Sequence, residues 1–198
     1  MALKINRKKG IWLLIIIIFL VTSIFYYQSS KSLLKDELSL ENEIPLEEII
    51  PDLYAGYSFA LSNSQSIGNT GGFVKDKVSS YYINGKLEPN KIYLSGSWKS
   101  NPNNLEAVSD SVIFLDFTAS EVLVAASPGN GQHKIKVTLG GEPLTKEQAG
   151  QDIVFENDES FIIVDELALY SLVNQKFNRG LLQLELDPGI KIGVFSFG

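Results

Sequence analysis

Apolar and polar residues alternate along most of the chain after Pro51, and this alternation predicts β-strands. Every second position is apolar in residues 134–139, and residues 182–186 repeat the pattern as Leu, Gln, Leu, Glu and Leu. Residues 111–118 and 122–126 are apolar on both faces, which is typical of strands near the centre of two packed sheets. The same criteria predict further strands at residues 54–60, 92–98, 161–164, 167–173 and 190–197.

Turn-forming residues separate these predicted strands. Ser-Pro-Gly-Asn-Gly occupies residues 127–131, Gly-Gly residues 140–141, Asn-Asp residues 157–158 and Asp-Pro-Gly residues 187–189. Such residues supply the fixed or positive φ angles that hairpins and tight turns need. Many short strands without a long amphipathic helix predict an all-β domain, a β-sandwich of the jelly-roll type, over residues 51–198.

The first fifty residues have a different pattern, which predicts one N-terminal transmembrane helix. Residues 11–27 form an apolar run near the lower limit for crossing a bilayer. Basic side chains precede the run in the tail formed by residues 1–10, so we expect this tail to stay cytoplasmic and the C-terminal domain to be extracytoplasmic. Residues 28–50 are acidic and are interpreted as a juxtamembrane stalk.

A cleaved signal peptide is the alternative interpretation of the same N-terminal pattern. Val21-Thr22-Ser23 resembles a small-residue cleavage site. The apolar run is longer than a usual signal-peptide core, and the bulky residues 24–27 follow the candidate site, so an uncleaved anchor is favoured. Either interpretation predicts that residues 51–198 are exported to the outer side of the cell membrane.

Composition excludes several classes of active site. The chain has 198 residues, no Cys and one His, so thiol chemistry, cysteine-ligated metals and histidine triads lack their residues. A formal charge of −6 argues against nucleic-acid binding. His133 is interpreted as a surface residue, and residues 68–72, which lack the Lys-Ser/Thr of a phosphate loop, as a flexible loop. We therefore expect no catalytic residues, no metal and no cofactor.

Carboxylate pairs leave a glycan hydrolase as a less favoured alternative. Asp158-Glu159 and Asp165-Glu166 could in principle supply an acid and a base. Adjacent residues on a strand point to opposite faces, however, so solvated turn charges are the favoured interpretation.

Six short motifs, in this order, resemble the C-terminal domain of DipZ-type thioredoxin-like proteins. They are Pro-Asp-Leu-Tyr-Ala-Gly-Tyr at residues 51–57, Tyr-Leu-Ser-Gly-Ser-Trp at 93–98, Phe-Thr-Ala-Ser-Glu-Val at 117–122, Leu-Gly-Gly-Glu-Pro at 139–143, Leu-Tyr-Ser-Leu-Val at 169–173, and Asp-Pro-Gly followed by Phe-Ser-Phe-Gly at 187–189 and 195–198. The resemblance covers residues 51–198. It implies a jelly-roll β-sandwich similar to carbohydrate-binding modules, attached in larger relatives to a thioredoxin domain. These 198 residues contain no CxxC pair, so the thiol–disulfide activity of the family is not carried over.

The candidate ligand-binding residues are Tyr93, Ser95, Ser97, Trp98 and Tyr170. Tyr93, Ser95 and Ser97 are expected on the wet face of their strand, where an aromatic ring beside hydroxyls suits a glycan. Trp98 shares its face with Ile92 and Leu94, so burial in the core is favoured over a sugar-stacking role. We therefore expect a membrane-anchored, non-catalytic binding module for an envelope glycan or a partner protein. The alternative is an accessory subunit of a thiol-redox system, whose partner would be an exported thioredoxin-like protein.

Overall fold

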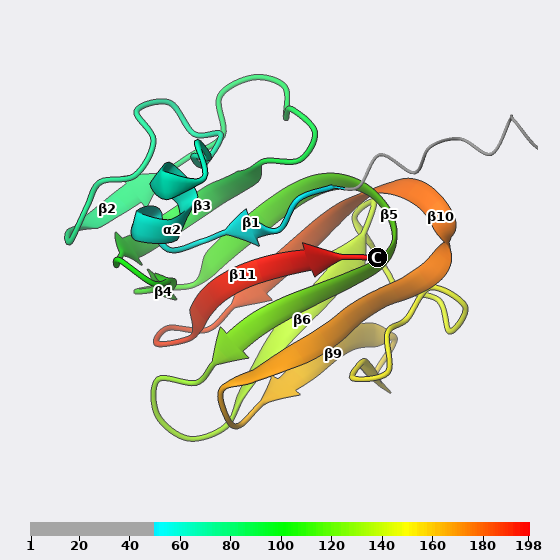
Figure 1. The fold of residues 1–198 in the computed structure, drawn as a ribbon. Coiled ribbons are helices and arrows are strands. Elements are labelled where there is room, and N and C mark those ends of the chain that lie inside the picture. The colour runs from blue at the N-terminus through cyan, green and yellow to red at the C-terminus, as the bar shows by residue number, and fades with distance from the viewer. Residues whose placement is uncertain (1–49) are drawn as a thin grey trace, which may run out of the picture. The chain divides into compact units, whose positions relative to one another are not determined.

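A computed structural model describes residues 50–198, which form a mostly β domain. Eleven strands and one helix of six residues make up the regular structure of this part, and the strands join into one sheet (Figure 1). The elements are β1 (Leu53–Tyr54), α2 (Tyr57–Ser62), β2 (Val78–Tyr81), β3 (Ile92–Ser100), β4 (Leu105–Ala107), β5 (Ser111–Ser127), β6 (His133–Leu139), β7 (Glu142–Pro143), β8 (Val154–Glu156), β9 (Glu159–Val164), β10 (Ala168–Leu186) and β11 (Lys191–Phe197).

The predicted basic tail 1–10, the transmembrane anchor 11–27 and the stalk up to residue 49 lie outside the described residues. In residues 50–198, no helix has the length and apolar character needed to cross a bilayer.

Two long strands fold the sheet over on itself. β5 has 17 residues and β10 has 19, and the two pair in antiparallel fashion from one end to the other. The first half of β5 also pairs with β3, whereas its second half pairs with β11. Figure 1 shows both long strands bending at the same side of the domain. The sheet therefore has two layers, a first layer with β2, β3, β6, β8 and β9, and a second layer with β1 and β11.

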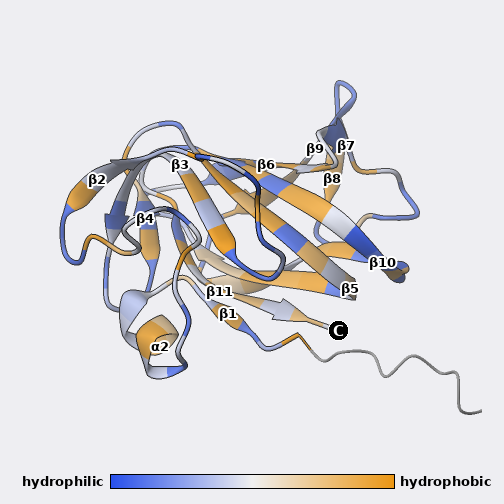
Figure 2. Ribbon diagram, turned by 90° about the horizontal axis from the view of Figure 1, so that it is seen from above, coloured by the Kyte–Doolittle hydropathy of each residue, from blue (hydrophilic) through white to orange (hydrophobic). Residues whose placement is uncertain are grey.

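One core lies between the layers, because alternate side chains of each strand point inward. Along β5 the inward residues Ile113, Leu115 and Phe117 are completely buried, and the residues between them are only half-buried. Figure 2 shows the corresponding alternation of apolar and polar residues along β5, β6 and β10. The largest fully buried side chains are Trp98, Phe117 and Phe195. Burial of side chains of this size contributes about 1.5–3 kcal/mol each.

Most of the predicted strands are present, but two of them are joined into one long strand that runs through both layers. Residues 111–118 and 122–126, predicted as two strands, are both parts of β5. The chain keeps its pairing with β10 through the bend, and β10 accommodates the bend by register shifts between Ser171 and Val173 and between Asn174 and Asn178. At the bend, the N–H groups of Ser120 and Glu121 donate to the carbonyl oxygen of Gly198. β5 therefore bends without interruption of the strand.

The prediction of a strand at residues 54–60 is wrong. β1 ends at Tyr54, and residues 57–62 form the helix α2 instead. The chain turns at Gly56, where a Cβ atom would lie 2.3 Å from the backbone carbonyl carbon of Asn103. This close approach lets the first N–H groups of the helix, at Tyr57 and Ser58, donate to carbonyl oxygens of the 101–102 segment.

The predicted turns are confirmed by their backbone angles. Gly140 and Gly141, between β6 and β7, have φ angles of +66° and +87°. Asn157 and Asp158, between β8 and β9, have φ angles of 51° and 60°. Positive φ at both central positions matches the right-handed twist of the flanking strands. The sequence therefore located these hairpins by their turn chemistry.

Candidate functional site

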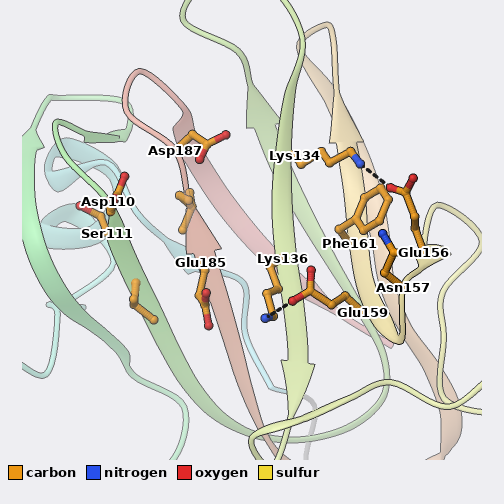
Figure 3. Close-up of a pocket in the computed structure, with 12 residues that line it drawn as sticks. Asp110, Ser111, Lys134, Lys136, Glu156, Asn157, Glu159, Phe161, Glu185 and Asp187 are labelled. Carbon is orange, nitrogen blue, oxygen red and sulfur yellow. Dashed lines mark hydrogen bonds and ion pairs between the residues drawn. The ribbon is translucent and has the colours of Figure 1, made fainter.

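An open groove of about 480 Å³ lies on the outer face of the first layer, on the side of the sheet away from the core (Figure 3). Strand alternation places its residues there. The strand register aligns Val112 of β5 with Glu185 of β10, Glu185 with Lys136 of β6, and Lys136 with Phe161 of β9. The groove is lined by Asp110, Ser111, Val112, Lys134, Lys136, Glu156, Asn157, Glu159, Phe161, Glu185, Leu186 and Asp187.

Two ion pairs form the wall on the β6 and β9 side. The Nζ atom of Lys134 lies 2.7 Å from a carboxylate oxygen of Glu156, and that of Lys136 lies 2.6 Å from one of Glu159 (Figure 3). The hydrogen bond to Glu159 raises the pKa of Lys136 above its usual value. The Lys134 ammonium also lies 4.1 Å from the centre of the Phe161 ring, a cation–π distance. These contacts hold both lysines over the floor of the groove.

Carboxylates dominate the opposite wall. Glu185 accepts a hydrogen bond from the side-chain amide of Gln183 at 3.0 Å. Asp187 has an oxygen 3.9 Å from Nδ1 of His133. Figure 3 shows Asp110, Glu185 and Asp187 on the side facing the two lysines. The groove therefore has two lysines, each paired with a glutamate, on one wall and carboxylate acceptors on the other.

His133, predicted as a surface residue, begins β6 at the end of this groove. Its side chain is 22% exposed, and its Nε2 lies 2.7 Å from the carbonyl oxygen of Asn130. The imidazole is thus engaged in holding the turn before β6.

The structure corrects the expected exposure of Tyr93. The ring lies on the outer side of β3, opposite Phe114, as the alternation predicted. It is nevertheless only 5% exposed, because the segments between α2 and β2 and between β2 and β3 cover it. Gly68 lies against the ring, where a Cβ atom would be 2.2 Å from a ring carbon, and the Tyr93 hydroxyl accepts a hydrogen bond from the N–H of Glu88 at 3.0 Å. The Tyr93 ring is therefore not a surface on which a ligand can stack.

The other candidate residues also fail to converge on an open surface. Trp98 is completely buried, and its indole N–H donates to the carbonyl oxygen of Ser95 at 2.9 Å. Tyr170 is buried in the second layer, with its hydroxyl donating to the carbonyl oxygen of Glu166. Ser95 and Ser97 are half-buried on β3. These five residues therefore do not form a joint binding surface, since the three aromatic rings are enclosed by protein.

Asn69 ties down the loop that was interpreted as flexible. Its side chain is buried beside β3, where Oδ1 accepts from the N–H of Leu94 at 2.8 Å and Nδ2 donates to the carbonyl oxygen of Leu94 at 2.8 Å. Nδ2 also lies 3.1 Å from the carbonyl oxygen of Tyr82. The Asn69 side-chain amide thus pairs with the backbone of Leu94 as a neighbouring strand would. These hydrogen bonds hold the loop that contains Gly68 against the Tyr93 ring.

The sequence pattern does not reveal the groove, because the lining residues come from four separate segments. Lys134, Lys136 and Glu185 were recognised as the polar faces of their strands. The strand order β5-β10-β6-β9 decides which of these polar faces lie next to each other. Alternation within a strand does not show this order. A sequence signal for the groove is the presence of an acidic turn between β8 and β9 together with a strand that carries lysines, because opposite charges favour cross-strand pairs.

No group of three or more Asp, Glu or His side chains in residues 50–198 is arranged to hold a metal ion. Of the groove carboxylates, Glu156 and Glu159 pair with lysines, Glu185 accepts from an amide, and Asp187 lies 3.9 Å from an imidazole nitrogen.

Comparisons with known proteins confirm the resemblance found in the sequence. A family model described as "Thioredoxin like C-terminal domain" matches residues 50–198. No curated protein matches the chain. Among solved structures, a similar chain is an active-site mutant of a family two carbohydrate esterase from Clostridium thermocellum, with 22% sequence identity and a TM-score of 0.43. The similarity covers 56% of this chain and 32% of the esterase chain.

Proposed function

Because the chain belongs to the thioredoxin-like C-terminal domain family, we propose that it is a non-catalytic binding module for an envelope glycan, which binds in the groove of the first layer. In the same proposal, the two layers are those of a jelly-roll β-sandwich, and one N-terminal span holds the domain on the extracytoplasmic face of the cell membrane.

The single observation that supports glycan binding most is the chemistry of the groove. Sugars present hydroxyl groups that both donate and accept hydrogen bonds, together with less polar C–H faces. The groove offers ammonium donors at Lys134 and Lys136, an acceptor at Glu185 and an apolar floor at Val112. All four side chains stand on strands, so the ligand meets a surface that is already ordered.

A hydrolase is less well supported by the same groove. A glycosidase needs one carboxylic acid that can give up a proton to the leaving group. Glu156 and Glu159 each accept a hydrogen bond from a lysine ammonium, so both carboxylates already have a partner within the groove wall. The absence of cysteine and the single histidine in the sequence support the non-enzymatic proposal further.

The accessory role in thiol-redox chemistry is the second candidate, and the family assignment favours it. A partner thioredoxin-like protein would supply the thiols that this sequence lacks. In that case the groove would bind a protein surface instead of a sugar.

Substitution Glu185→Gln tests the groove directly. We expect it to weaken glycan binding by about 1–3 kcal/mol, because a charged hydrogen-bond acceptor at the centre of the groove is lost. The measurement is isothermal titration of the purified full-length chain, in a mild detergent, with soluble fragments of envelope glycans. Glu147→Gln, an exposed residue that does not line the groove, is the matched control and should bind like the wild type.

Glycan affinity that is the same in wild type and Glu185→Gln would contradict the groove as the glycan site. If wild type binds no glycan but captures an exported thioredoxin-like protein, and Glu185→Gln weakens that capture, the accessory role replaces glycan binding.

The membrane placement has its own test. Protease added to intact spheroplasts should remove residues 51–198, because the basic residues before position 11 favour a cytoplasmic N-terminus. Immunoblotting with an antibody against the domain measures the loss. Survival of the domain until the membrane is lysed would contradict the orientation, and a mature N-terminus near Ser30 would show that the anchor is cleaved.

A further inference from the structure

The first layer has two open edges on opposite sides of the domain. Among the described residues, β2 pairs with β3 alone and β8 pairs with β9 alone. Figure 2 shows β2 at one side of the domain and β8 at the other. The outer backbone groups of each strand are free of a neighbouring strand. An open edge of this kind is a template for pairing with another chain.

Both edges also expose large apolar side chains. Near the β2 edge, Val78 is 56% exposed and Tyr82 is 69% exposed. On β8, Val154 is 40% exposed and Phe155 is 43% exposed. These side chains stand beside the open backbone, so pairing of the two strands would also remove apolar surface from water.

The edges carry charges of opposite sign. Residues 75–86, which include β2, hold three lysines and one aspartate. Residues 152–159, which include β8, hold four acidic residues and no basic one. Lys134 and Lys136 pair with Glu156 and Glu159 and so neutralise only part of the acidic edge. Two β2 edges therefore repel each other, as do two β8 edges, whereas one edge of each kind attracts.

We propose that the β2 edge of one copy of this chain docks on the β8 edge of a second copy. The contact is heterologous, so each copy keeps one edge free for a further copy and the copies form a row. The strands have four and three residues, so each contact is small and its affinity is low. A row of this kind presents many binding grooves at once, which raises the strength of attachment to a repeating ligand.

Two variants, each disabling one edge, test this proposal. Lys77→Glu with Val78→Glu makes the β2 edge acidic, and Val154→Lys with Phe155→Lys makes the β8 edge basic. Lys176→Glu with Phe177→Glu is the control, because it also replaces one lysine and one apolar residue, at exposed positions on the bend of β10. Sedimentation velocity of the full-length chain in a mild detergent measures association over a range of concentrations. Thermal melts confirm that each variant is folded.

We expect wild type and the control to associate as concentration rises, and less so as salt is raised, since the attraction between exposed charges is screened. Each edge variant should weaken association by about tenfold or more, the effect of losing about 1.4 kcal/mol. Mixing the two edge variants should restore association, because together they hold one intact edge of each kind.

Three results would overturn the proposal. They are the same association in wild type and both edge variants, loss in only one edge variant, or no recovery on mixing. Loss in only one edge variant would indicate a two-fold contact through a single edge. None of these results bears on glycan binding in the groove, which is measured separately.

Discussion

Trp98→Ala should lower the free energy of unfolding by about 3–5 kcal/mol, the range for removing a large aromatic side chain from a core. Trp98 is completely buried and is among the largest side chains of the core. Its removal leaves a cavity and also frees the carbonyl oxygen of Ser95 from its indole partner. Urea denaturation followed by circular dichroism measures the change, since the variant also loses a fluorescent reporter.

Tyr82→Ala is the control for this variant. Tyr82 is also an aromatic residue of the first layer, but it is 69% exposed, so its loss should change the stability by about 0.5 kcal/mol or less. If Trp98→Ala costs no more than Tyr82→Ala, the burial of Trp98 in the core is wrong.

Asn69→Ala should destabilise the domain by about 2–6 kcal/mol. The substitution removes the partners of both the N–H and the carbonyl oxygen of Leu94, a residue with no exposed surface. Each buried backbone group left without a partner costs about 1–3 kcal/mol. Hydrogen exchange gives a local measurement beside the denaturation curve, because the Leu94 amide should exchange much faster once its acceptor is gone.

Asn63→Ala is the matched control, because its Nδ2 donates to the carbonyl oxygen of Phe59 at the exposed end of α2. This loss should cost at most about 0.5 kcal/mol, since water replaces the partner. Unchanged exchange at Leu94 in Asn69→Ala would show that the Asn69 amide does not hold β3.

Local sequence patterns predicted most of the strands and the tight turns, because both depend on neighbouring residues. Alternation placed β6 and the second half of β10, and Gly140 and Asn157 located two hairpins. The helix α2 was missed because Gly56 turns the chain only where it meets the backbone of Asn103, a contact distant in sequence. The continuity of β5 was missed for a similar reason, since the 119–121 bend is held by pairing with β10 and by Gly198.

The candidate site shows the same division between local and distant information. The side of β3 on which Tyr93 lies followed from alternation, but its cover by Gly68 and Glu88 depends on how the two segments flanking β2 fold back over the ring. The groove depends on the register that brings Val112, Glu185, Lys136 and Phe161 into one row. No spacing within a single segment encodes that row.

The long strands β5 and β10 run through both layers, so the two layers are joined by continuous backbone. Val122 and Leu172 are buried in the second layer and lie on β5 and β10, the same two strands that carry Val112 and Glu185 in the groove. The binding surface therefore draws its rigidity from the whole domain. Because most of this pairing joins residues far apart in the sequence, the domain is expected to fold more slowly than a helical protein of similar size.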